Sequence, residues 1–123
     1  MSRIRSRDTL PELTVRRLVH KMGFRYRLHV PSLPGRPDLV FPKLRKIIEV
    51  RGCFWHQHQG CIDSHLPKTR HDYWLPKLQR NRDRDGQNLA KLENLGWRVL
   101  IVWECEATVS QPLGRKIKSF LKS

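Results

Sequence analysis

One histidine and the three cysteines of this chain constrain its fold more than any other sequence feature. Cys53, His58 and Cys61 lie within nine residues, and Cys105 follows the most apolar segment of the sequence. Three thiolates and one imidazole are a common tetrahedral ligand set for structural zinc, in which a local group is joined by a distant ligand. The spacing therefore predicts a zinc site that uses all three cysteines, with inert buried cysteines as the alternative.

The segment at residues 52–70 supports this prediction, because it has little hydrophobic periodicity and cannot bury much apolar surface. A bound metal is a physically sensible way to order such a loop. His56 and His65 remain alternatives to His58 as the imidazole ligand. An odd number of cysteines does not suggest a disulfide framework, so we expect reduced cytosolic thiols or metal ligands.

The first half of the chain predicts one helix followed by short strands. An amphipathic helix is expected to begin at Thr9, which opens a capping box with a proline in the first turn, and to end before Gly23. Alternating apolar and basic residues predict a half-buried strand over residues 24–29. Two further strands, 38–41 and 46–50, are joined by a segment of suitable length for a hairpin turn.

The second half predicts a helix, a strand and a closing helix. The helix is expected over about residues 76–94, and the polar stretch 80–85 within it is interpreted as an exposed face. Its inward face is predicted to contain Leu78, Leu89, Leu92 and Leu95. The apolar run 97–103 predicts a central, buried strand, and a closing helix is expected over 112–121. This order favours an α/β fold, in which helices flank a mixed central sheet within a single domain spanning residues 1–123.

The net charge of the chain indicates its partner. A charge of +14 on 123 residues repels itself unless it meets a polyanion, and nucleic acid is the commonest soluble one. The basic residues interleave with tryptophans rather than forming a tail; a merely soluble basic protein is the alternative. No stretch approaches the roughly 18 apolar residues of a membrane span, so no membrane partner is expected. Residues 1–8 are polar and basic, unlike a secretory signal.

Two carboxylates of the predicted hairpin suggest a hydrolytic site. Asp38 begins one strand and Glu49 lies in its partner, so the pair could bind one magnesium ion, which prefers oxygen ligands. Arg51, on the same face of the strand as Glu49, could hold a scissile phosphate. Glu12 is either a third carboxylate or half of the capping box. His56 is either a general acid or base, or a surface histidine.

Several sequence blocks, in one order, closely resemble the very short patch repair (Vsr) endonucleases. The blocks are Ser-Arg-Ile-Arg-Ser-Arg-Asp-Thr at 2–9, Leu-Pro-Gly-Arg-Pro-Asp at 33–38, Gly-Cys-Phe-Trp-His at 52–56, and Gly-Trp-Arg-Val-Leu at 96–100 with Val-Trp-Glu-Cys at 102–105. The resemblance spans roughly residues 2–106. It implies a restriction-endonuclease-like fold and an enzyme that nicks one strand beside a T·G mismatch left by deamination of 5-methylcytosine.

The resemblance also implies roles for individual residues. Asp38 would be the essential magnesium ligand, His56 the catalytic histidine, and Glu12 an auxiliary acid that positions His56 or a water. The structural zinc ligands would be Cys53, His58, Cys61 and Cys105. An aromatic wedge of Phe54, Trp55 and Trp74 would enter the base stack at the mismatch, where insertion costs least. For Trp74, a place in the hydrophobic core is the alternative.

Two positions depart from the family pattern. Glu49 and Arg51 stand where the family has an apolar or aromatic residue and a histidine, so Glu49 is expected to supply a magnesium ligand instead. This shift leaves two alternatives open: a Vsr-like restriction or homing-type nuclease that cuts matched duplex DNA, and a zinc-stabilised DNA-binding module without chemistry. The expected protein is a bacterial cytoplasmic monomer associated with the nucleoid. Its expected partners are mismatched double-stranded DNA and other repair proteins.

Overall fold

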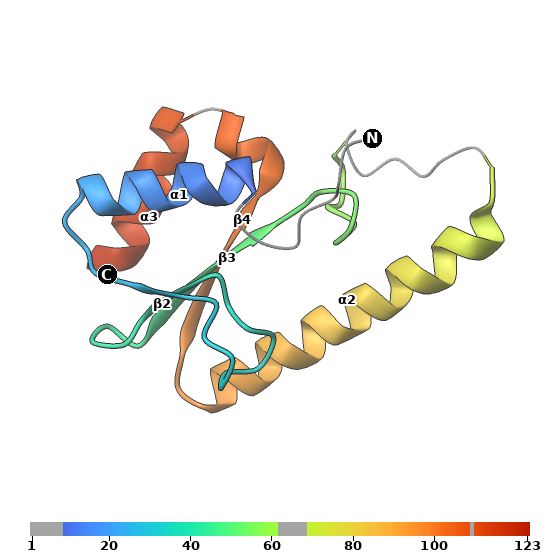
Figure 1. Cartoon of the computed structure of the whole chain (residues 1–123), viewed down its shortest axis with the longest axis horizontal. Coiled ribbons are helices and arrows are strands. Elements are labelled where there is room, and N and C mark those ends of the chain that lie inside the picture. Colours follow the sequence, from blue (N-terminus) through green and yellow to red (C-terminus); the bar gives the residue numbers. More distant parts are fainter. Residues whose placement is uncertain (1–8, 62–68, 109) are drawn as a thin grey trace.

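A computed structural model describes residues 9–61, 69–108 and 110–123 of the chain. His65 and the block at residues 2–8, both used in the sequence predictions, lie outside this part. The elements in chain order are α1 (Leu10–Lys21), β1 (Arg27–Leu28), β2 (Leu39–Phe41), β3 (Lys46–Arg51), α2 (His71–Asn94), β4 (Arg98–Trp103), the 3₁₀ helix η2 (Glu104–Thr108) and α3 (Ser110–Lys122) (Figure 1).

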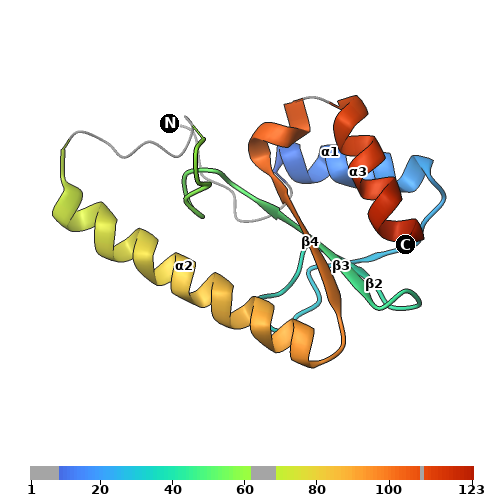
Figure 2. The same cartoon turned by 180° about the vertical axis from the view of Figure 1, so that it is seen from behind.

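The strands form one mixed sheet in the order β1-β2-β3-β4. β1, β2 and β3 pair antiparallel, and β4 returns through α2 to lie parallel to β3. Helices α1 and α3 cover one face of the sheet, and α2 lies on the opposite face and extends beyond it (Figures 1 and 2). This arrangement confirms the predicted α/β class, with a mixed sheet between helices.

The larger part of the core lies between the sheet and the pair α1 and α3. The Thr9 side chain caps α1 by accepting a hydrogen bond from the Glu12 N–H, as the capping box predicts. Apolar residues one turn apart then point to the sheet. The buried members of this cluster are Val15, Val19, Leu39, Phe41, Ile48, Val102, Leu113, Ile117 and Leu121. Each such side chain stabilises the fold by about 1.5–3 kcal/mol, so α1 and its Glu12 are held firmly against the sheet.

A smaller cluster attaches α2 to the other face. Val40 and Ile47 of the hairpin pack against Leu92 and Trp97 at the end of α2. The Arg45 guanidinium lies 4.4 Å from the Trp97 ring centre and donates a hydrogen bond to the Leu95 carbonyl. The cluster is confined to the C-terminal end of α2. The rest of this helix contacts the loop after β3, through Asp85 and His56 and through Trp74 and Phe54.

Two expected strands differ from the observed ones. The strand expected at 24–29 is reduced to Arg27–Leu28, because His29 adopts a positive φ of 47° that ends the extended backbone. The strand expected to be central, β4, is an edge strand of the four-stranded sheet. It is apolar because α3 covers one of its faces and α2 the other, rather than because strands flank it on both sides.

The long helix also differs from its prediction. It begins at His71, so Pro76 lies inside the helix rather than at its start and cannot donate the backbone hydrogen bond to the Asp72 carbonyl. Leu78 and Leu92 are buried as expected, whereas Leu95 is 53% exposed because it is the C-cap and lies past the last turn. Among the described residues, no helix is both long and apolar enough to cross a membrane.

Candidate functional site

Asp38 lies where the hairpin strand β2 begins, and backbone contacts fix it on both sides. Its Oδ2 accepts a hydrogen bond of 2.7 Å from the Val50 N–H of β3. Its carbonyl accepts a hydrogen bond of 3.2 Å from the His29 N–H at the end of β1. The hairpin register pairs Leu39 with Ile48, so its continuation by one residue brings Asp38 opposite Glu49. Asp38 therefore stands at the meeting point of three strands.

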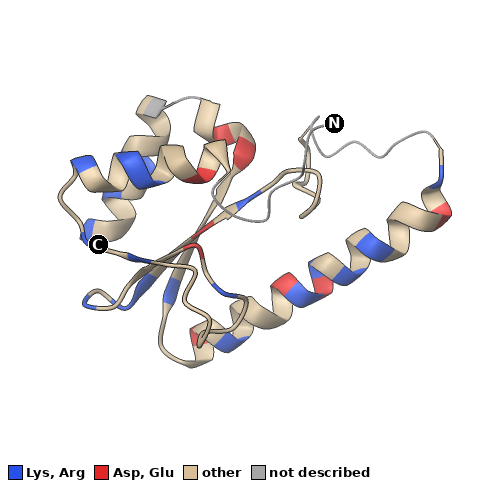
Figure 3. Cartoon of the chain, in the orientation of Figure 1, with Lys and Arg blue, Asp and Glu red and all other residues tan. Residues whose placement is uncertain are grey.

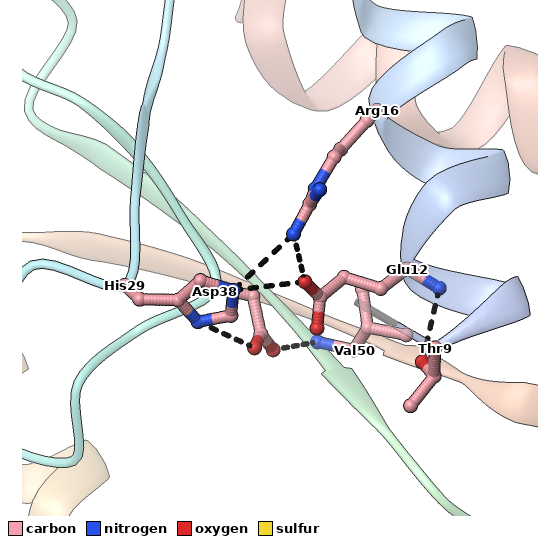
Figure 4. A network of polar contacts seen from close by, with 6 residues as sticks. All are labelled: Thr9, Glu12, Arg16, His29, Asp38 and Val50. Atoms are coloured by element: carbon pink, nitrogen blue, oxygen red, sulfur yellow. Dashed lines mark hydrogen bonds and ion pairs between the residues drawn. The ribbon is translucent and has the colours of Figure 1, made fainter. Parts of the chain in front are cut away.

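A polar network joins Asp38 to the start of α1 (Figure 4). His29 lies between the two acids: its Nδ1 is 3.7 Å from Asp38 Oδ1, and its Nε2 is 2.9 Å from Glu12 Oε2. Arg16, one turn after Glu12, donates to the same Glu12 oxygen and has its Nη2 3.2 Å from His29 Nε2. Glu12 is only 2% exposed: its backbone N–H donates to the Thr9 cap, and its carboxylate belongs to this network.

The environment of Asp38 opposes its ionisation. Burial and the nearby Glu12 and Glu49 carboxyls, together with a hydrogen bond to Glu12, raise its pKa to about 7 against the lowering effect of the Val50 hydrogen bond. Burial also raises the pKa of Glu49, although Arg51 acts against this shift. A cation bound among these carboxyls would favour their ionised forms.

A second polar group lies on the α2 side of the sheet. Arg51 Nη2 is 3.6 Å from Glu49 Oε2, which is buried and has no hydrogen-bond partner among the described residues. His56 Nδ1 is 2.5 Å from Asp85 Oδ2 on α2. Asp85 belongs to the stretch 80–85 expected to be an exposed face; that expectation is wrong for Asp85, whose side chain is 19% exposed, and correct for most of its neighbours.

These groups line two adjoining clefts. The larger, of about 750 Å³, contains Glu12, Arg51, His56 and Asp85, together with Phe54 and Trp55. The smaller, of about 320 Å³, contains His29, Asp38 and Glu49 and shares Val50, Arg51, His56 and Asp85 with the first. The carboxylates, the histidines and two of the aromatic side chains therefore face one connected hollow in the surface.

The donor groups around Asp38 fit a hard divalent cation. Ligand atoms of Glu12, His29 and Asp38 lie within 4.8 Å of one another, which is close enough to share one ion. Glu49, which is ion-paired with Arg51, lines the same cleft as Asp38 and offers a further carboxylate there. Carboxylate oxygens are the preferred protein ligands of Mg²⁺, which also keeps water and phosphate oxygens in its shell.

The predicted metal ligands Cys53, His58, Cys61 and Cys105 are brought together by the fold, with ligand atoms within 4.8 Å of one another. His58 Nδ1 is 3.7 Å from Cys53 Sγ and 3.5 Å from Cys105 Sγ. A tetrahedral zinc ion with ordinary bond lengths separates sulfur and nitrogen ligands by about 3.5 Å, so these spacings fit. The group can therefore hold a metal between the loop after β3 and the start of η2.

The surroundings of these four residues affect both the ionisation of the thiols and the positions of the side chains. Burial and the neighbouring thiols of Cys61 and Cys105 raise the pKa of Cys53 to about 12, against the lowering effect of a backbone hydrogen bond with Cys105, and burial raises the pKa of Cys105 as well. The His58 ring stacks on Trp103, with 4.2 Å between ring centres. Glu104 Oε1 accepts a hydrogen bond from the Cys53 N–H. A metal ion would reverse the disfavoured ionisation of the thiols, since it binds the thiolate form.

The aromatic residues expected to form a wedge also lie together. Phe54 is 5.2 Å from Trp55 and 5.3 Å from Trp74 between ring centres, all in edge-to-face contacts. Tyr73, 46% exposed, extends the cluster along α2. Trp74 is half-buried in this surface group rather than in either hydrophobic core, so the core alternative for it is wrong.

Basic residues are spread over the helices on both faces of the sheet. Figure 3 shows Lys and Arg along α2, interspersed there with acidic residues, and on the helices of the opposite face, while further acidic residues lie where α1, η2 and the sheet meet. Lys77 illustrates the arrangement, with its Nζ 5.8 Å from the Trp55 ring centre. A basic surface attracts a polyanion, and the acidic centre between the basic segments is where a cation could be bound next to it.

Sequence reasoning found most of these residues and missed three. Glu12, Asp38, Glu49, Arg51 and His56 were expected at the site, and the fold brings them to the connected clefts. The sequence reasoning did not single out His29, Arg16 or Asp85. A helical spacing of four residues from Glu12 could have indicated Arg16. The approach of His29 and Asp85 depends on pairing between distant segments, for which the sequence holds no local signal.

Comparison with known proteins identifies relatives of this chain. Over residues 1–62 the chain matches the family described as DNA mismatch endonuclease Vsr. It is 48% identical to the type II nicking enzyme V.XorIIP of Xanthomonas oryzae pv. oryzae over 121 residues, 98% of this chain and 88% of the relative. It is 42% identical to the type II nicking enzyme V.NmeAIP of Neisseria meningitidis serogroup A over 106 residues, 86% of this chain and 75% of the relative.

A further relative is DNA mismatch endonuclease Vsr of Escherichia coli (strain K12), 45% identical over 105 residues, 85% of this chain and 67% of the relative. Acidic groups in a cleft of a strongly basic α/β protein, together with these relatives, define a DNA endonuclease. The chain belongs to the DNA mismatch endonuclease Vsr family, as the resemblance of its sequence blocks predicted. The substrate of the chain is accordingly DNA.

Proposed function

We propose that this chain is a magnesium-dependent endonuclease that nicks one DNA strand beside a T·G mismatch, in very short patch repair. One observation carries the proposal: catalytic-type carboxylates and the aromatic side chains Phe54 and Trp55 line one connected hollow. Chemistry and base-stack insertion can then act on the same short stretch of duplex. Relatives named as a mismatch endonuclease and as nicking enzymes support this reading.

Asp38 is the central cation ligand in this proposal, and Glu49 opposite it supplies a second oxygen. The position of Glu49 supports this role, because it lines the same cleft as Asp38 and its buried Oε2 has a 3.6 Å ion pair with Arg51 but no hydrogen bond among the described residues. Bound Mg²⁺ would polarise the phosphate and lower the pKa of the attacking water. Arg51 neutralises charge on the scissile phosphate from the same strand face, and Glu12 closes the site from α1.

His56 is the general base or acid of the proposal. Asp85 holds its Nδ1, which leaves Nε2 as the nitrogen that exchanges a proton with water or with the leaving oxygen. An acid–imidazole pair of this kind fixes the orientation of the ring. The loop that carries His56 is anchored to α2 through Asn81, whose side chain donates to the Trp55 carbonyl. Asp85 is thus a positioning residue for His56.

A structural zinc ion is proposed for the group Cys53, His58, Cys61 and Cys105, on the ligand chemistry and spacings described above. Its function would be to hold the loop of His56 and the aromatic cluster against the end of β4. Phe54, Trp55 and Trp74 are proposed to enter the base stack. A mismatched pair is already weakly stacked, so insertion there costs less than in matched duplex.

A second function is favoured by Glu49 and Arg51, which depart from the family pattern. A carboxylate and an arginine at these positions resemble general restriction-type nucleases, which cut matched DNA. A non-catalytic binding module is a third reading, in which the same basic surface holds DNA without cleavage. All three readings share the DNA surface, so binding alone does not separate them.

The test compares nicking of a T·G duplex with its T·A counterpart, in Mg²⁺, by denaturing gel. The proposal expects a nick in one strand of the T·G duplex only, lost in Asp38→Ala and kept in Asp83→Ala, which changes an exposed acid of α2. Equal nicking of both duplexes would establish the restriction-type reading instead. No nick in either, with retained binding, would leave the binding module. Arg51→His should improve the T·G preference if the departure only tunes specificity.

A further inference from the structure

We propose that His29 supplies a ring nitrogen to the divalent cation bound by Asp38 and Glu12, so that this chain has a mixed nitrogen and oxygen cation site. The inference rests on the proposed function, since it concerns the cation of that same site. His29 was not singled out by the sequence, and it enters through geometry alone.

Both ring nitrogens of His29 face acids. Nε2 lies 2.9 Å from Glu12 Oε2, and Nδ1 lies 3.7 Å from Asp38 Oδ1. A neutral imidazole carries one proton, so one of its nitrogens directs a lone pair toward a carboxylate that is itself rich in lone pairs. Such a contact is repulsive unless a proton or a metal cation lies between the two groups.

Glu12 identifies the ring nitrogen that donates. Nε2 lies 2.9 Å from Glu12 Oε2, the oxygen to which Arg16 also donates, so Nε2–H forms a hydrogen bond to that carboxylate. Nδ1 is 3.7 Å from Asp38 Oδ1, which is too long for a hydrogen bond, so Nδ1 is the nitrogen that faces a cation held by Asp38. An imidazole that donates from one ring nitrogen to a carboxylate and presents the other to a cation is the usual arrangement of a metal ligand.

The backbone holds His29 in this place at some cost. Its φ of 47° lies in the left-handed region, which is uncommon for residues other than glycine, although asparagine, aspartate and histidine adopt it more often than most. The hydrogen bond from its N–H to the Asp38 carbonyl ties the two residues together. Strained positions of this kind are retained where surrounding structure and function over-determine them. The ring is consequently pre-organised beside Asp38 rather than free to turn away.

An imidazole ligand changes which cation is preferred. Carboxylates suit Mg²⁺ and Mn²⁺ alike, whereas imidazole binds first-row transition metals better than it binds Mg²⁺. The chain should therefore bind Mn²⁺ more tightly than Mg²⁺, and the ratio of the two affinities should exceed that of a site with oxygen ligands alone. Replacement of His29 should lower the affinity for Mn²⁺ more than the affinity for Mg²⁺, so that the two affinities become similar.

The experiment measures Mn²⁺ bound to the full chain, prepared with one equivalent of Zn²⁺. Electron spin-echo modulation reports ¹⁴N coupling to the bound Mn²⁺, and the free Mn²⁺ signal gives the affinity. His29→Asn is the principal variant because asparagine tolerates a positive φ, and His29→Gln is the second. Both should lose the nitrogen coupling, with Mn²⁺ affinity lowered about tenfold or more. His20→Gln, an exposed histidine of α1, should change neither.

Three results would overturn the inference. The first is nitrogen coupling that persists in both His29 variants, and the second is coupling that disappears in His56→Gln while His29→Asn retains it. The third is absence of coupling in the unchanged chain. Nicking assays run in parallel separate this failure from failure of the function. Asp38-dependent nicking without nitrogen coupling refutes the His29 ligand alone, whereas coupling through His29 without any nicking refutes the endonuclease proposal alone.

Discussion

Replacement of Asp38 by asparagine should abolish nicking and at the same time stabilise the protein in the absence of catalytic cation. The carboxyl is 18% exposed and lies between Glu12 and Glu49, so its charge is unfavourable in the folded chain. An asparagine of the same shape carries no charge, and its amide oxygen can still accept the Val50 N–H. The site is thus a place where the fold gives up stability for function.

The magnitude follows from the pKa of Asp38, which the folded chain raises from 3.8 to about 7. The folded state holds the proton more tightly than the unfolded state, so stability falls as pH rises from about 4 to about 7. One pKa unit corresponds to about 1.36 kcal/mol, so the loss at pH 7 is up to about 4 kcal/mol. We expect Asp38→Asn to be more stable by about 2–4 kcal/mol, or roughly 8–16 °C in Tm.

Thermal unfolding at pH 7.5 and pH 5, without added Mg²⁺, tests this reasoning. The difference in stability between variant and unchanged chain should shrink to less than about half at pH 5, where most Asp38 is protonated. Added Mg²⁺ should raise the Tm of the unchanged chain and not that of Asp38→Asn. Asp83→Asn, an exposed acid, is the control. A Tm for Asp38→Asn equal to or below that of the unchanged chain at pH 7.5 would refute the argument.

Three further predictions concern the supports of the site. Cys105→Ala should lower bound zinc, measured by atomic absorption, from one equivalent to less than half, and full retention would exclude Cys105 as a ligand. Asp85→Asn should slow nicking by about 10- to 100-fold while duplex affinity is kept, because it orients His56; an unchanged rate would remove Asp85 from the mechanism. Lys46→Met should destabilise by about 2–3 kcal/mol in urea unfolding, because the buried ammonium donates to the carbonyls of Phe120, Leu121 and Ser123 at the end of α3. Lys43→Met, at an exposed position, should fall within about 0.5 kcal/mol of the unchanged chain, and an equal loss in both would refute the capping role of Lys46.

The elements that sequence reasoning predicted well are those with local signals. The Thr9 capping box marks the start of α1, and the observed cap uses the same Thr9 and Glu12. The apolar runs on each side of residues 42–45 indicate the hairpin, whose register then brings Asp38 opposite Glu49. Both features are decided by residues a few positions apart, so a single sequence contains the necessary information.

The features that were missed depend on contacts between distant segments. β4 is apolar on both faces, and this pattern does not tell a central strand from an edge strand covered by helices. Asp85 follows the polar pattern of an exposed helix face, yet α2 is placed so that this one carboxylate reaches His56. His29 lies nine residues before Asp38, and only the pairing of β1 with β2 across the intervening loop brings them together.

The residues proposed for cleavage and those proposed for mismatch selection come from different elements. The proposed cation ligands lie on α1 and at the ends of the paired strands, whereas Phe54 and Trp74 come from the Cys/His loop and the exposed start of α2. A change in the aromatic cluster should therefore affect the cation ligands mainly through the loop that carries both Phe54 and His56. Trp74→Ala would lower the preference for T·G over T·A, while the rate on a saturating T·G duplex stays close to that of the unchanged chain. If the rate fell as steeply as the preference, insertion of the wedge would be needed to bring the phosphate to Asp38, and recognition and chemistry would be one step.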